Sequence, residues 1–179
     1  YYEAPLDFPV DDIVRDIKRY CAAFTLVPEI SVHGGEPFLH PHIGKICREL
    51  SSIPNLVFIN LTTNGNILPS EEILQDLACS GADIHQSDYG KLSKKQADLF
   101  SACSDHNIYC DIHFVNPNEK WTRPGPVRPH FRTPEENDQR YRECVSTIIC
   151  CQIMDGKVFR CPTAAHESAQ GKIPDNAGD

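Results

Sequence analysis

The stretch EISVHGGEPFLHPH, residues 29–42, decides how the rest of the chain is interpreted. A short β-branched run, residues 29–33, stops at Gly34 and Gly35, as a strand does when it ends in a turn. Glycine has no Cβ, so the backbone of this turn can approach a ligand closely, and Glu36 can hold an ammonium group. No Lys-Ser/Thr pair follows the glycines, so a phosphate-binding loop is disfavoured. The alternative is a plain strand-to-helix turn.

Strand-like and helix-like segments alternate on both sides of this turn. Apolar residues recur at helical spacing from Val10 to Phe24, and further helices are predicted over 43–50, from Ser70 to Gly81, and from Ser93, which forms a capping box with Gln96. The other predicted strands cover 56–61, 82–86 and 108–115. This alternation favours an α/β fold with parallel strands and right-handed crossovers, either a doubly wound sheet or an α/β barrel. Since the first clear element is a helix, we expect a strand to precede it.

The pattern changes after residue 115. Residues 116–134 are rich in proline and are expected to form a long loop, either a linker or an active-site cover. A charged helix is predicted over 135–144 and a β-hairpin over 147–161, with Asp155-Gly156 as its two-residue turn. The tail from Glu167 is polar and expected to be loose. We therefore expect a core, residues 1–115, and a cysteine-containing segment, residues 135–179, joined by the loop.

Composition limits the classes of partner. The chain has 179 residues and a formal net charge of −8, so it has no basic field that would hold a nucleic acid. No apolar stretch approaches the roughly 20 residues that span a bilayer, and no signal-peptide pattern is visible, which favours a cytoplasmic protein without a membrane partner. Nine cysteines, an odd number, fit a disulfide framework poorly and suggest metal ligands or buried thiols.

The motifs at the predicted strand ends resemble those of the radical SAM superfamily. Residues 34–41, GGEPFLHP, match the motif that ends the second barrel strand in that family, and residues 63–65, TNG, match the end of its third strand. The resemblance implies a partial barrel of this type, followed by a small helix and hairpin. It also implies that S-adenosylmethionine binds with its methionine end on Gly34, Gly35, Glu36 and Pro37, and with its ribose or carboxylate near Thr63, Asn64, Ser87 and Asp88.

The resemblance further implies the chemistry. Radical SAM enzymes cleave S-adenosylmethionine reductively at a 4Fe-4S cluster, which gives a 5′-deoxyadenosyl radical that abstracts hydrogen from a substrate. Their cluster is held by a CxxxCxxC loop between the first strand and first helix, and none of the nine cysteines has that spacing there, so the loop is expected before Tyr1. An electron donor is an implied partner. The substrate is unknown, with a peptide as one candidate.

The cysteines near the C-terminus form a second candidate site. A two-residue turn at 155–156 pairs residue 154 with 157, 152 with 159 and 150 with 161, which places Cys150 and Cys161 opposite each other, with Cys144 upstream. This arrangement resembles the opening of the SPASM or twitch auxiliary-cluster region. No cysteine follows Cys161, so three alternatives stay open: a partial iron–sulfur site, a zinc site with His166 as fourth ligand, or a reduced cysteine pair.

Other residues admit a structural explanation. His40 and His42 fit surface positions at a helix start, and His113 fits either a packed strand residue or a contact to the cofactor or substrate. A second hypothesis for the whole chain is a non-catalytic α/β binding module with a structural thiolate zinc or iron–sulfur site.

Overall fold

The computed structural model describes residues 7–115, 131–146 and 151–173. The chain divides into two compact units, one of residues 7–120 and one formed mainly by residues 121–179, and each is described by itself. The Pro-rich loop expected over 116–134 lies outside the described residues except for its last four positions.

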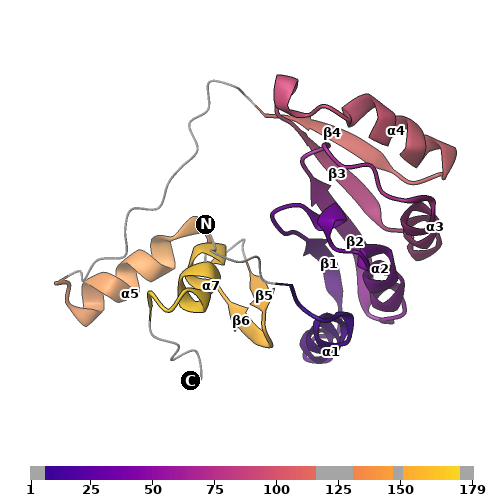
Figure 1. Ribbon diagram of the computed structural model, residues 1–179. Helices are drawn as coiled ribbons and strands as arrows, with labels where there is room; N and C mark the ends of the chain where they lie inside the picture. The colour runs from indigo at the N-terminus through magenta and orange to yellow at the C-terminus, as the bar shows by residue number, and fades with distance from the viewer. Residues whose placement is uncertain (1–6, 116–130, 147–150, 174–179) are drawn as a thin grey trace. The chain divides into compact units, whose positions relative to one another are not determined.

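The first unit alternates helices and strands along the chain (Figure 1). Its elements are α1 (Val10–Cys21), β1 (Val27–Val32), the 3₁₀ turn η1 (Pro37–Leu39), α2 (Ile43–Ser51), β2 (Leu56–Thr63), α3 (Glu71–Ser80), β3 (Asp83–Asp88), the 3₁₀ turn η2 (Gly90–Leu92), α4 (Gln96–Asp105) and β4 (Cys110–Phe114). The four strands form one parallel sheet in the order β1-β2-β3-β4. The predicted α/β class with parallel strands is confirmed.

All four helices of this unit lie along the same face of the sheet (Figure 1). A doubly wound sheet carries helices on both faces, whereas a barrel carries them only on its outside, so the arrangement is that of a barrel segment. The core lies between the helices and this face, where Ile46, Leu61, Leu77, Ile84 and Leu99 are almost completely buried.

The predicted boundaries of α3 are confirmed, whereas the predicted cap of α4 does not form. The side chain of Ser70 accepts a hydrogen bond from the backbone N–H of Ile73, and α3 ends at Gly81 with φ 66°, both as predicted. The capping box predicted for Ser93 and Gln96 is wrong, because α4 begins after Lys95 and has no side-chain cap. Ser93 is buried and its hydroxyl is engaged elsewhere, as described below.

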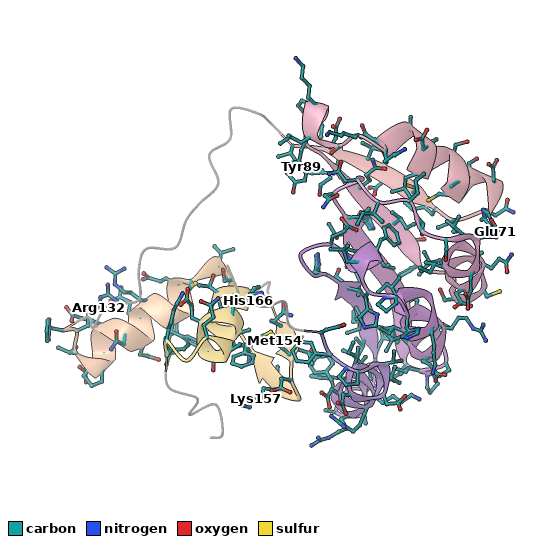
Figure 2. The ribbon with its side chains drawn as sticks, in the orientation of Figure 1. Glu71, Tyr89, Arg132, Met154, Lys157 and His166 are labelled. Carbon is teal, nitrogen blue, oxygen red and sulfur yellow. The ribbon has the colours of Figure 1, made fainter. Side chains whose placement is uncertain are left out.

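The second unit contains α5 (Pro134–Glu143), β5 (Gln152–Met154), β6 (Lys157–Phe159) and α7 (Pro162–Ala169). The hairpin register is confirmed: Gln152 pairs with Phe159 and Met154 with Lys157, the two residues that flank the turn in Figure 2. Asp155 and Gly156 both have positive φ, 51° and 71°, as a primed two-residue turn requires.

The sequence did not predict α7. Residues 167–169, expected to belong to a loose tail, form the last turn of this helix. The helix starts with Pro162 in its first turn, a position where proline is favoured because its missing N–H would have no intrahelical partner. In the described part of the chain, no helix is long and apolar enough to cross a membrane.

Candidate functional site

The carboxylate of Glu36 joins the ends of β1 and β2. Glu36 is 8% exposed, and its Oε1 accepts hydrogen bonds from the backbone N–H of Phe38 (3.2 Å) and the hydroxyl of Thr63 (2.8 Å). Its Oε2 accepts one from the backbone N–H of Asn64 (2.9 Å). The acid therefore caps η1 and ties the glycine turn to the Thr63-Asn64-Gly65 turn.

Neither the backbone conformation nor the packing of the described structure requires glycine at positions 34 and 35. Neither has φ in the left-handed range, and a Cβ built on Gly35 meets no atom within 4 Å, while one on Gly34 comes no closer than 3.8 Å to the nitrogen of Glu36. Gly65 differs: its φ is +70°, and a Cβ there would lie 2.5 Å from Nε2 of the buried Gln86. The fold requires glycine at 65, whereas at 34 and 35 it leaves open backbone beside a buried carboxylate.

Ser93 links the ends of β2 and β3. Its hydroxyl accepts a hydrogen bond from the backbone N–H of Tyr89 (2.9 Å) and lies 3.0 Å and 3.2 Å from the carbonyl oxygens of Asn64 and Ser87. The structure thus brings Glu36, Thr63 and Asn64 into direct contact. Ser87 is linked to Asn64 through the hydroxyl of Ser93. Asp88 is different: it accepts from the backbone N–H of Gly90 (2.7 Å), and strand alternation puts it on the opposite face from Ser87.

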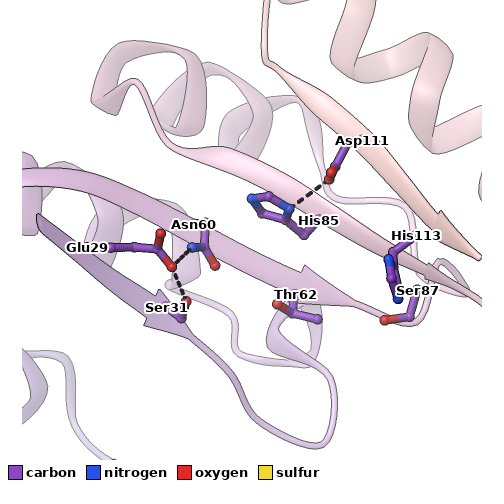
Figure 3. Close-up of a pocket in the computed structure, with 8 residues that line it drawn as sticks. All are labelled: Glu29, Ser31, Asn60, Thr62, His85, Ser87, Asp111 and His113. Atoms are coloured by element: carbon purple, nitrogen blue, oxygen red, sulfur yellow. Dashed lines mark hydrogen bonds and ion pairs between the residues drawn. The ribbon is translucent and has the colours of Figure 1, made fainter. Parts of the chain in front are cut away.

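The sheet face that carries no helices in the described unit is polar. Two polar side chains, two positions apart, point to this face from each strand, and they line a cavity of about 330 Å³: Glu29 and Ser31 on β1, Asn60 and Thr62 on β2, His85 and Ser87 on β3, and Asp111 and His113 on β4 (Figure 3). A volume of roughly 300 to 1,000 Å³ is usual for small-molecule sites. The cavity can hold a small polar ligand.

Two hydrogen-bonded groups organise this cavity (Figure 3). On one side, Oε1 of Glu29 accepts from the hydroxyl of Ser31 (2.8 Å) and from Nδ2 of Asn60 (2.5 Å). On the other, Nδ1 of His85 lies 2.7 Å from Oδ1 of Asp111, with both side chains about 40% exposed. The second ring nitrogen of His85 is turned away from Asp111, toward the side of the cavity where Asn60 lies.

The charges on this face influence one another. Burial raises the pKa of the Asp83 carboxyl, repulsion from Asp111 and Glu29 adds to the rise, and His85 opposes it. Partial loss of hydration lowers the pKa of His33, with a smaller contribution from His85, while Glu29 opposes it. These carboxylates and imidazoles therefore share one electrostatic environment.

Residues 1–85 match the family model described as the Radical SAM superfamily. The matched segment contains the glycine turn, Glu36 and the Thr63-Asn64-Gly65 turn that this acid joins. These residues belong to the radical SAM superfamily. The resemblance expected from the motifs is thereby confirmed.

A curated relative agrees with this membership. The chain is similar to a GTP 3′,8-cyclase from Pelotomaculum thermopropionicum, with 45% identity over 61 residues. This match covers 34% of the present chain and 17% of the cyclase, so the chain spans only a small part of that relative's length.

The polar face of the sheet was not predicted as a site from the sequence. Only Ser87 and His113 of its eight lining residues were singled out, because the strands were recognised by their apolar runs. The signal was present as pairs of polar residues at i and i+2 within each strand, such as Glu29 with Ser31 and His85 with Ser87.

The C-terminal cysteines stay a prediction. Cys144 follows α5 and is exposed, Cys161 precedes α7 and is half-buried, and Cys150 lies outside the described residues. Among the described residues there is no group of three or more His, Cys, Asp or Glu side chains that could hold a metal ion. The predicted pairing of Cys150 with Cys161 lies two positions beyond the last confirmed pair, Gln152 with Phe159, and outside the described residues.

Proposed function

We propose that this chain is part of a radical SAM enzyme that binds the methionine end of S-adenosylmethionine at the edge formed by Gly34, Gly35 and Glu36. The observation that carries the proposal is the open glycine turn, which lies beside a buried carboxylate that accepts three hydrogen bonds. The family membership of residues 1–85 supports it.

The residues at this edge fit the amino-acid end of the cofactor. A carboxylate has about four acceptor positions, and three of those of Glu36 take donors from the protein, so one further donor such as an ammonium N–H can be accepted. Backbone carbonyls of the glycine turn can approach the same group, since no Cβ intervenes. We assign Pro37 to fixing the turn and Thr63, which is buried and donates to Glu36, to holding the acid in place. Asn64, Ser87 and Asp88 are assigned to the ribose or carboxylate, Asp88 through the turn that follows β3.

The cofactor, when bound with a reduced 4Fe-4S cluster, would supply a 5′-deoxyadenosyl radical for hydrogen abstraction. The described residues of this chain do not fit that cluster, since they contain no group of three metal-ligating side chains. No step of the proposal is therefore assigned to cysteines of this chain. Its own residues hold the cofactor, orient it through Glu36 and limit access to one edge of the sheet.

The remaining partners follow from the same proposal. An electron donor would reduce the cluster, and a peptide is the first candidate substrate. Cys144, Cys150 and Cys161 are proposed to hold an auxiliary iron–sulfur cluster, or zinc with His166 as the fourth ligand. Measuring iron and zinc per chain after anaerobic purification separates these two metals, and a triple Cys→Ser variant should lose the bound metal.

The activity is tested with the full-length protein, reconstituted anaerobically with iron and sulfide and incubated with S-adenosylmethionine and dithionite. We expect 5′-deoxyadenosine in the wild type. Gly35→Ala should reduce binding of S-adenosylmethionine about tenfold or more, which corresponds to about 1.4 kcal/mol, while its stability stays close to that of the wild type because the new methyl group meets no protein atom.

The control is a similarly small change at a site away from this edge. Ser104→Ala, at an exposed position on α4, should leave both binding and stability unchanged. Absence of 5′-deoxyadenosine from the reconstituted wild-type protein would refute the proposed activity. Unchanged binding of S-adenosylmethionine by Gly35→Ala would refute the assigned place of its methionine end.

A further inference from the structure

The cavity on the polar sheet face is rich in negative charge. None of its eight lining residues is Lys or Arg, while Glu29 and Asp111 are among them, and Asp83 lies on the same face. The only lining residues able to carry positive charge are His85 and His113, and the ring of His85 faces the carboxylate of Asp111. The carboxylates of this face therefore favour a positively charged ligand.

Glu29 offers the contact for such a ligand. Both of its hydrogen bonds, from Ser31 and Asn60, end on Oε1, so Oε2 keeps its acceptor positions. The two bonds also fix the orientation of the carboxylate, which lowers the entropy lost when a ligand binds. Asn60 is only 7% exposed, so the group that holds Glu29 in place is itself rigidly packed.

Asp111 contributes through its long-range electrostatic field and not through direct contact with the ligand. Glu29 is on β1 and Asp111 on β4, three strand spacings apart, or about 14 Å. One cationic group cannot touch both, but the charges of Asp111 and Asp83 add to the potential at Glu29. Asp111 also faces Nδ1 of His85, which leaves the other nitrogen of that ring directed into the cavity.

We infer that this cavity binds an amine or guanidinium group of the substrate, with Oε2 of Glu29 as the direct partner. The inference rests on the proposed function only in calling the ligand a substrate. A lysine-like or arginine-like side chain carries this charge, so a peptide or a polyamine belongs to the expected class. S-adenosylmethionine is also a cation, and the experiment must distinguish the two.

The test uses argininamide as the cationic probe and citrullinamide, which is nearly the same shape but has a neutral side chain, as its control. Binding is followed by NMR at the ring protons of His85 and His113, with His106, which is not among the lining residues, as an internal reference. We expect argininamide to shift the first two histidines and citrullinamide to bind at least about tenfold more weakly, because a charge-assisted hydrogen bond is replaced by a neutral one.

Two variants and a control locate the contact. Glu29→Gln should weaken argininamide binding about tenfold, and Asp111→Asn about twofold to fourfold, as expected for a charge roughly 10 to 14 Å away in a largely aqueous setting. Asp105→Asn removes an exposed carboxylate at the end of α4 and should have no effect. Equal binding of the two probes, or unchanged binding by Glu29→Gln, would overturn the inference.

One further arm needs no variant. If S-adenosylmethionine displaces argininamide, the cavity belongs to the cofactor and the assignment to substrate fails. Formation of 5′-deoxyadenosine, measured separately, decides the proposed function whatever these titrations give.

Discussion

Replacing Glu36 by glutamine tests whether this acid is a structural tie between two strand ends. In the wild type its carboxylate accepts from Phe38, Thr63 and Asn64, and the side chain is almost fully buried. Glutamine has the same shape but one acceptor oxygen and one NH₂ donor. If the oxygen keeps the Phe38 and Thr63 bonds, the NH₂ group faces the backbone N–H of Asn64, donor against donor.

The cost follows from these contacts. Leaving one buried donor without its acceptor costs about 1 to 3 kcal/mol, and the two bonds that remain lose their ionic character, which accounts for about half the strength of each. We therefore expect Glu36→Gln to lower the free energy of unfolding by about 2 to 4 kcal/mol. Such a loss is a large part of the 5 to 15 kcal/mol that is typical of a whole domain.

The assay is chemical denaturation at 25 °C, followed by circular dichroism. Glu72→Gln is the matched control, since Glu72 is exposed in the first turn of α3, and removing its charge should cost less than about 1 kcal/mol. Thr63→Val, alone and combined with Glu36→Gln, completes a double-mutant cycle. Because the two side chains are in contact, we expect a coupling energy of about 1 kcal/mol.

The reasoning is refuted if Glu36→Gln unfolds within about 0.5 kcal/mol of the wild type, as an exposed substitution would. It is refuted in a different way if the double mutant is additive. Additivity would mean that the carboxylate and the Thr63 hydroxyl stabilise the fold independently, and that the tie between the two strand ends does not exist as described.

Three further outcomes are expected. Gly65→Ala should destabilise the chain by about 1 to 2 kcal/mol from its φ of +70° alone, and by more if Gln86 cannot move, as measured by the same denaturation. The ion pair of His106 with Glu71 raises the pKa of the imidazole and lowers that of the carboxyl, each mainly through their mutual hydrogen bond. The stabilisation that this ion pair gives should therefore be greatest between about pH 4.5 and 6.5. It should fall at higher pH as His106 loses its proton, and at lower pH as Glu71 gains one. His106→Gln should flatten this pH dependence of the melting temperature. Burial raises the pKa of the Cys47 thiol to about 12, so iodoacetamide at pH 7.5 should leave this cysteine unmodified in the folded protein, as read by peptide mass spectrometry.

The sequence predicted those elements whose signals are local. Ser70, Gly81 and the Asp155-Gly156 turn act through their own backbone neighbours, so their patterns were sufficient. Ser93 failed as a cap because its hydroxyl bonds to Tyr89 and to groups contributed by other strand ends, contacts that exist only after folding.

The candidate site was predicted in part for the same reason. The glycine turn and the Thr63-Asn64-Gly65 turn were recognised as motifs, but no pattern indicated that one carboxylate would bond to both. The polar cavity was missed because its lining is spread over four strands, and only the parallel register brings Glu29, His85 and Asp111 to the same face.

Glu36 has two roles that constrain each other. Three of its acceptor positions hold the fold together, so a ligand can use only what remains, and the backbone of Gly34 and Gly35 must supply the other contacts to an ammonium group. This division explains why an acid and open glycines occur side by side: the acid fixes the turn in place, and the glycines keep the turn accessible. A substitution at Glu36 should therefore change stability and ligand binding together, whereas one at Gly35 should change binding alone.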